Sequence, residues 1–187
     1  MKVVCGLGNP GPEYEATRHN VGWWLVDRAR DAWGFPAFRR EGIVRLTEGR
    51  LDGRTVVLVK PQTYMNRSGA ALAPLGHLAG FDVARDLLIA VDDVALDVGR
   101  VRFRAAGSSG GHNGLRSIEA ALRSRDYARL RIGVGGAPPD ADLAGWVLSD
   151  FEAGDEEAVR ALIPGVVEGV RIWLEEGTEA AARRCNR

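Results

Sequence analysis

Cysteine, lysine and long hydrophobic runs are all scarce in this 187-residue sequence. Its two cysteines, Cys5 and Cys185, lie at opposite ends of the chain without a disulfide or metal-site spacing, so we expect both to be reduced. No apolar run approaches the roughly 20 residues that span a bilayer, and the first residues show no signal-peptide cleavage pattern. These absences exclude a disulfide-stapled miniprotein, argue against contact with a membrane and predict a cytoplasmic protein.

Patterns for covalent and metal-dependent catalysis are also missing. No serine lies in a G-x-S-x-G motif, and neither cysteine resembles an activated thiol. The three histidines, His19, His77 and His112, lack the close-spaced partners that are typical of zinc ligands. We therefore expect no covalent nucleophile and no metal, which leaves an activated water as the candidate reagent.

Charge is balanced over the whole chain but not along it. Although 25 Lys and Arg residues match 25 Asp and Glu residues, segment 99–131 carries eight arginines and only two carboxylates, a local charge of +6. Segment 140–157 carries seven carboxylates and no basic residue. Such runs are most often solvated faces, but the planar arginine fork also suits phosphate. Segment 99–131 is therefore a candidate phosphate-binding surface.

Hydrophobic periodicity predicts a single α/β domain over residues 1–187, with a twisted mixed β-sheet and helices on both faces. Strand-like segments 43–47 and 55–60 flank an Asp-Gly turn, which predicts an antiparallel hairpin and hence a mixed sheet. A helix expected over 68–78 should be kinked or split by Pro74. The other expected elements are strands 2–6, 86–92, 100–104 and 130–134 and helices 21–33 (with Thr17 and Asn20 as candidate caps), 113–123, 155–175 and 178–184.

The glycine-rich turn at residues 6–11 matches G-x-G-x-x-G, the pattern of a dinucleotide site. Pro10 and Pro12 keep the backbone extended where a Rossmann loop must begin a helix, and the acidic residue expected about 20 positions later is missing. We therefore reject a dinucleotide enzyme. The turn instead presents Asn9, whose amide can both donate and accept hydrogen bonds.

His19 follows the first expected strand, and Asp92 and Asp93 lie where another strand ends. Ligands of open α/β sheets bind at the carboxyl ends of strands, so His19 is a candidate general base and Asp92 a candidate partner that fixes its tautomer. The plainer alternatives are a structural histidine and carboxylates that cap a turn. Three turn asparagines leave a similar choice between a polar pocket and a backbone role: Asn9, Asn66 and Asn113.

Several motifs of this chain match, in the same order, the sequence pattern of one known protein family, and the match extends from residue 3 to about residue 175. They are 6–11 with Tyr14, 17–20, 60–69, 92–93, 110–115 and 129–133. In these segments the chain resembles the bacterial-type peptidyl-tRNA hydrolases. The resemblance implies hydrolysis of the ester between a peptide and the terminal ribose of tRNA, which recycles tRNA from stalled translation. It further implies a monomer without metal or cofactor, whose partner is tRNA.

The resemblance also implies roles for individual residues. His19 would activate water, Asp92 would orient His19, and Asn9 and Asn113 would hold the substrate and the carbonyl under attack. The remaining positions that match are Tyr14 and Asn66 as substrate contacts, Met65 as an apolar wall beside the histidine, and Arg102 and Arg131 as a clamp on the tRNA 5′ phosphate.

Two positions depart from the family pattern. Residues 91–95 read Val-Asp-Asp-Val-Ala where His-Asp-Glu-Leu-Asp is frequent, and Arg102 replaces a usual lysine, which keeps the charge and changes its geometry. The main alternative is a relative that binds RNA and has lost catalysis. Retention of His19, Asp92, Asn9 and Asn113 argues against it, because a pure binder needs no histidine base.

Overall fold

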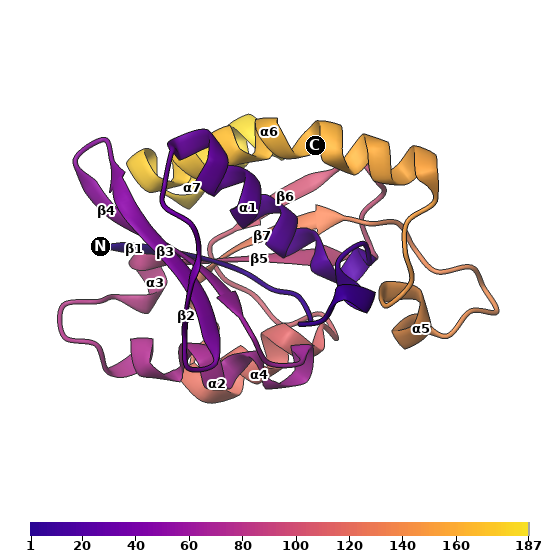
Figure 1. The fold of residues 1–187 in the computed structure, drawn as a ribbon, viewed down its shortest axis with the longest axis horizontal. Coiled ribbons are helices and arrows are strands. Elements are labelled where there is room, and N and C mark those ends of the chain that lie inside the picture. The colour runs from indigo at the N-terminus through magenta and orange to yellow at the C-terminus, as the bar shows by residue number, and fades with distance from the viewer. Residues whose placement is uncertain (187) are drawn as a thin grey trace.

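The computed structural model describes residues 1–186, which form a seven-stranded sheet between two layers of helices (Figure 1). The strand order is β2-β3-β4-β1-β5-β7-β6. The pairs β1–β4, β1–β5 and β5–β7 are parallel, and β2–β3, β3–β4 and β6–β7 are antiparallel, which confirms the predicted mixed α/β sheet. The strands are β1 Lys2–Gly6, β2 Arg39–Glu41, β3 Val44–Leu51, β4 Arg54–Pro61, β5 Leu87–Asp93, β6 Val101–Arg104 and β7 Ala128–Gly133.

Helices cover both faces of the sheet (Figure 1). One face carries α1 Val21–Trp33, α6 Ala153–Glu176 and α7 Thr178–Cys185, and the other carries α2 Ser68–Leu72 and α4 Asn113–Leu122. Alternate side chains of the central strands enter two separate apolar clusters, one under each layer, because both faces of these parallel strands are buried. The short helices are α3 Val83–Asp86 and α5 Leu143–Val147. No helix within residues 1–186 is both long and apolar enough to span a membrane.

The structure corrects several expected elements. The helix expected over 68–78 is split as predicted: α2 ends at Leu72, and a 3₁₀ helix Ala73–His77 follows with Pro74 in its first turn. The expected strand 130–134 begins earlier, at Ala128. Side-chain capping of α1 by Thr17 or Asn20 was wrong, since both side chains bind other backbone groups.

Gly22 brings the start of α1 against the carboxyl ends of β1 and β5. A Cβ atom at Gly22 would lie 2.5 Å from the Ala90 carbonyl oxygen and 2.6 Å from the Leu7 nitrogen. Only glycine permits so close an approach of two backbones. The contact places the short 3₁₀ helix Arg18–Asn20, which directly precedes α1, beside the end of β5.

Asp86 at the end of α3 gives a test of pH-dependent stability. Burial raises the pKa of its carboxyl, but Arg85 at 2.9 Å, the Asp82 backbone N–H at 3.0 Å and Lys2 at 3.3 Å outweigh burial and lower that pKa to about 2. Because the folded pKa lies below the unfolded value of about 3.9, ionised Asp86 stabilises the protein above pH 4, and this contribution disappears as the pH falls to about 2.

We expect Asp86→Asn to lower the free energy of unfolding by about 2 kcal/mol at pH 7. Urea unfolding should show the difference from the parent shrinking between pH 4 and pH 2. Glu157→Gln, which changes an exposed carboxylate, should show no such dependence. A difference for Asp86→Asn that stays constant with pH would contradict this account.

Candidate active site

His19 and Asp92 meet where α1 begins and β5 ends. His19 lies in the 3₁₀ helix before α1, and its Nδ1 atom is 2.8 Å from Oδ1 of Asp92. Both residues are buried, with 8% and 2% of their surfaces exposed. The structure thus brings together the two residues that the sequence singled out as a base and its partner.

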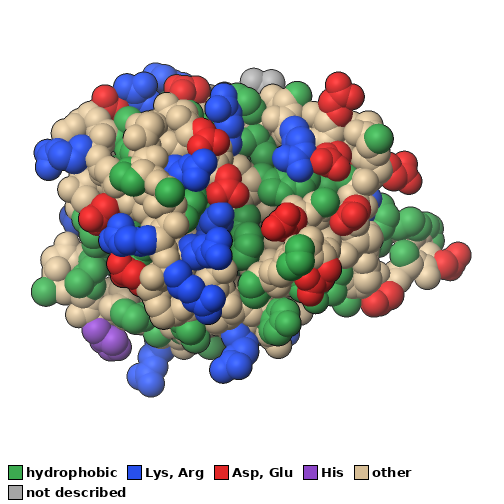
Figure 2. Space-filling model, in the orientation of Figure 1, with side chains coloured by type: hydrophobic (Ala, Val, Ile, Leu, Met, Phe, Trp, Pro, Cys, Tyr) green, Lys and Arg blue, Asp and Glu red, His purple; other side chains and the backbone are tan. Residues whose placement is uncertain are grey.

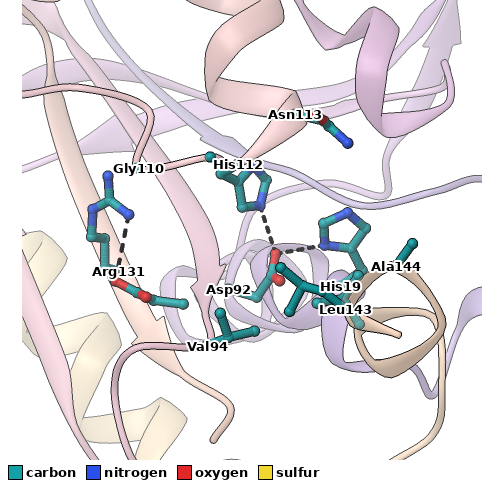
Figure 3. Close-up of a pocket in the computed structure, with 12 residues that line it drawn as sticks. His19, Asp92, Val94, Gly110, His112, Asn113, Arg131, Leu143 and Ala144 are labelled. Atoms are coloured by element: carbon teal, nitrogen blue, oxygen red, sulfur yellow. Dashed lines mark hydrogen bonds and ion pairs between the residues drawn. The ribbon is translucent and has the colours of Figure 1, made fainter. Parts of the chain in front are cut away.

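His112 is a second histidine on the same carboxylate oxygen, and the sequence analysis gave it no role. Its Nε2 atom is also 2.8 Å from Oδ1 of Asp92 (Figure 3). His112 is the N-cap of α4, where its Nδ1 atom accepts hydrogen bonds from the backbone N–H groups of Gly114 and Leu115 at 3.1 and 3.4 Å. Since Nδ1 accepts, neutral His112 carries its proton on Nε2 and donates it to Asp92.

The charge of Asp92 then determines the tautomer of His19. Burial by itself raises the pKa of the Asp92 carboxyl, but electrostatic interactions with the His112 and His19 rings and the hydrogen bonds that they donate hold that pKa well below its ordinary value. An ionised Asp92 can only accept, so Nδ1 of His19 must donate. The other ring nitrogen of neutral His19 therefore keeps its lone pair, and it faces away from Asp92, on the side of Asn113 (Figure 3).

The same three side chains are the candidates for holding a metal. Their ligand atoms lie within 4.8 Å of one another. Both histidine nitrogens, however, point at one carboxylate oxygen at 2.8 Å, an ordinary hydrogen-bond length. Zinc ligands instead surround a shared centre about 2.0–2.2 Å from each donor atom. The arrangement therefore favours a hydrogen-bond network, and metal-free chemistry stays a prediction.

Asn9 lies in the turn after β1, where hydrogen bonds fix the orientation of its amide. Its Oδ1 atom accepts from the Met65 backbone N–H at 2.7 Å. Asn20 holds the Asn9 backbone with two further bonds, accepting from the N–H at 2.9 Å and donating to the carbonyl at 3.0 Å. With the amide oxygen engaged by Met65, the Nδ2 group of Asn9 is left as a donor without a partner among residues 1–186.

Two cavities meet at His19 and Asn113. One of about 330 Å³ extends past Asp92 and His112 to Arg131. The other, about 380 Å³, is lined by Asn9, aromatic rings and the 65–66 segment. Helix α5 borders both cavities through Ala144 and Val147. A ligand bound across the junction would touch His19, with one of its ends in each cavity.

Arg18 holds α5 beside His19, and the sequence analysis did not single it out. Its guanidinium is buried, stacks 3.5 Å from the Trp146 ring centroid and donates to the Ser149 and Asp150 carbonyls at 3.2 and 2.6 Å. Burial lowers the pKa of Arg18, and nearby carboxylates such as Asp150 oppose that effect. Helix α5 was itself not expected, because five residues are too few to show helical periodicity.

The basic segment 99–131 is only partly on the surface. Arg102 and Arg131 are direct partners on antiparallel β6 and β7, so both side chains point to one face of the sheet. Arg102 is exposed, whereas Arg131 is half-buried, 3.4 Å from Asp93 and 2.9 Å from the Ser108 carbonyl. Arg129 is buried and cannot belong to an exposed phosphate surface. The acidic segment gathers over α5 and the start of α6 (Figure 2).

Comparison with known proteins identifies the family of the chain. A family model described as peptidyl-tRNA hydrolase matches residues 3–187. The peptidyl-tRNA hydrolase of Gemmatimonas aurantiaca is 47% identical over 192 residues, covering 100% of both chains, and that of Symbiobacterium thermophilum is 43% identical over 187 residues, covering 99% of this chain and 98% of the relative. The chain belongs to the peptidyl-tRNA hydrolase family. The resemblance stated from the motifs is confirmed.

The fold agrees equally well with a solved peptidyl-tRNA hydrolase. The crystal structure of the Acinetobacter baumannii protein matches with a TM-score of 0.92 and 31% identity, covering 100% of this chain and 94% of that chain. Among the described residues, Arg102 is the one predicted site residue that borders neither cavity. The others line one or both: His19, Asp92, Asn9, Tyr14, Met65, Asn66, Asn113 and Arg131.

Proposed function

We propose that this protein cleaves the ester bond between the peptide and the terminal ribose of tRNA with a water activated by His19. The observation that carries the proposal is the buried Asp92 carboxylate, whose hydrogen bond fixes a proton on Nδ1 of His19 and leaves the other nitrogen free. That nitrogen faces the junction of the two cavities, where an ester can meet it. A protein that only bound RNA would not need this arrangement.

In this mechanism, Nε2 of His19 takes a proton from water while the water oxygen attacks the ester carbonyl carbon. Negative charge develops on the carbonyl oxygen, and the free Nδ2 donor of Asn9, with the amide of Asn113, stabilises it. The intermediate then expels the ribose oxygen, which takes the proton from His19. The products are a peptide carboxylic acid and free tRNA, with no covalent enzyme intermediate and no metal or cofactor.

The two cavities suit the two halves of this substrate. The 380 Å³ cavity is lined by the Tyr14 and Tyr64 rings, which meet edge to face with their centroids 6.3 Å apart, and by Met65 and the exposed amide of Asn66. Such a mixed apolar and amide lining fits a peptide. The 330 Å³ cavity leads from Asp92 to Arg131 and fits the end of the tRNA.

Arg102 and Arg131 are the proposed contacts to the tRNA 5′ phosphate. They share one sheet face, and Arg131 already borders the cavity that contains His19. A local basic region on a neutral chain favours binding of tRNA near its end over binding of nucleic acid in general. We further propose that the protein acts as a monomer in the cytoplasm, because one chain supplies every proposed site residue and its substrate arises during translation.

His19→Ala should lower kcat for peptidyl-tRNA by about 10²–10⁴-fold, since it removes the base. Asp92→Asn should also lower kcat strongly, because an amide can donate to His19 and thereby select the wrong tautomer. Hydrolysis of a purified peptidyl-tRNA, measured in the presence of EDTA, tests both variants, with circular dichroism as the control for folding. A folded His19→Ala protein that keeps the parent rate would rule out the mechanism.

His112 allows its cap and its contact with Asp92 to be tested separately. Asparagine is a good N-cap but is too short to replace the His112 bond to Asp92, whereas alanine loses both. His112→Asn and His112→Ala should therefore lower kcat equally and both lose the stability that the bond to Asp92 provides, with His112→Ala losing about 1 kcal/mol more because it also loses the cap. Parallel kinetics and thermal unfolding decide this. Parent-like kcat in His112→Asn would reduce His112 to a helix cap.

Arg102→Ala should raise KM for peptidyl-tRNA, leave kcat unchanged and flatten the log-log salt dependence by up to about one unit. A short peptidyl ester without the tRNA body should react normally. Arg131→Ala should affect both substrates, because Arg131 also holds Asp93 and Ser108. Arg183→Ala on α7 is the control. Equal losses on both substrates for Arg102→Ala would argue against a phosphate contact.

A further inference from the structure

Arg129 on β7 is a buried cation that contacts the loops on both sides of α4. Only 1% of its surface is exposed. Its guanidinium donates to the Ser108 carbonyl, in the loop before α4, at 3.1 Å and to the Arg125 carbonyl, in the loop after α4, at 2.8 Å. Glu119, in the body of the helix, lies 3.7 Å from the same guanidinium. One side chain of the sheet therefore fixes the start, the middle and the end of the α4 segment.

The start of α4 carries two groups of the proposed active site, His112 and Asn113. The loop before them has three glycines with positive φ, Gly107, Gly110 and Gly111, at 146°, 60° and 83°. Glycine adopts these angles readily, but it also gives the loop many alternatives. The bonds from the arginines of β7 to the Ser108 carbonyl restrict that freedom next to His112.

The cost of burying Arg129 argues that its contacts are specific. Burial lowers the pKa of Arg129, and the carboxylate of Glu119 opposes that effect. Its guanidinium carbon lies 4.4 Å from the centroid of the buried Tyr127 ring, but its Nε atom has no hydrogen-bond partner among residues 1–186. A buried cation with an unmade hydrogen bond is a poor way to gain stability, so the contacts of Arg129 point instead to the geometry that it imposes on its neighbours.

We propose that Arg129 is a positioning residue that acts through α4: it holds the Ser108 carbonyl and the helix so that His112 reaches Asp92 and Asn113 faces the cavity junction. The proposal rests on the proposed function. Arg129 itself touches neither the substrate nor the reacting atoms. Lysine cannot replace it, because one ammonium lacks the fork that reaches two separated carbonyls.

Kinetics in two backgrounds test this role. Arg129→Lys and Arg129→Met should lower kcat by about tenfold or more, with little change in KM, on both peptidyl-tRNA and a short peptidyl ester. In a background that carries both His112→Ala and Asn113→Ala, the same changes should cost much less, because both groups being positioned are already gone. Arg28→Met, an exposed arginine of α1, is the control. An equal fold-loss in both backgrounds, or no loss of kcat, would overturn the proposal.

Hydrogen exchange gives a readout that does not depend on activity. The Gly114 and Leu115 amides bind His112 Nδ1, so they should exchange faster in Arg129→Lys than in the parent, while amides of α1 stay unchanged. Unchanged exchange at these two amides would overturn the positioning role even if kcat fell. Faster exchange in a protein that lacks hydrolase activity altogether would instead preserve the positioning role and remove the proposed function.

Discussion

The Asp92 carboxylate is buried with a single oxygen accepting hydrogen bonds from His19 and His112, and the chemistry of the site follows from that arrangement. An ionised group at 2% exposure is stable only when its charge is compensated. The two histidines supply that compensation as donors, and their donation fixes both tautomers. Because His112 is also tied to the start of α4, the carboxylate links the tautomer of His19 to the placement of that helix.

Arginines hold the surrounding loops in a chain with only two lysines. Arg18 binds the carbonyls that follow α5, Arg129 binds those on either side of α4, and Arg131 shares the Ser108 carbonyl with Arg129. Arg18 reaches its two carbonyls from one guanidinium nitrogen, whereas Arg129 uses both nitrogens of the fork to reach carbonyls on opposite sides of α4, which one ammonium does less well. The shared carbonyl also means that an anion bound at Arg131 would act on the same loop that positions His112.

The sequence predicts those features whose causes are local. The Asp-Gly turn predicts the β3–β4 hairpin, and Pro74 predicts the break after α2. The meeting of His19 and Asp92 could be anticipated because strand ends of a parallel sheet share an edge. The contact between His112 and Asp92 could not be anticipated, because it depends on the path of the glycine-rich loop that places His112 beside the end of β5. The sequence predicts Arg129 as part of a basic surface, because a charged residue on a strand is normally exposed, and this prediction is wrong because Arg129 is buried.

In the proposed mechanism, the position of His19 between two dissimilar cavities explains why the site needs few charged groups at the point of reaction. The ester lies where a peptide ends and a nucleotide begins, so binding energy from both sides can place its carbonyl against His19. In that mechanism Asn9 and Asn113 would provide neutral donors for the oxyanion, and the amide of Asn9 is already oriented because Met65 engages its oxygen. The arginines lie farther out, where they can bind phosphate or hold loops without placing a positive charge beside the base.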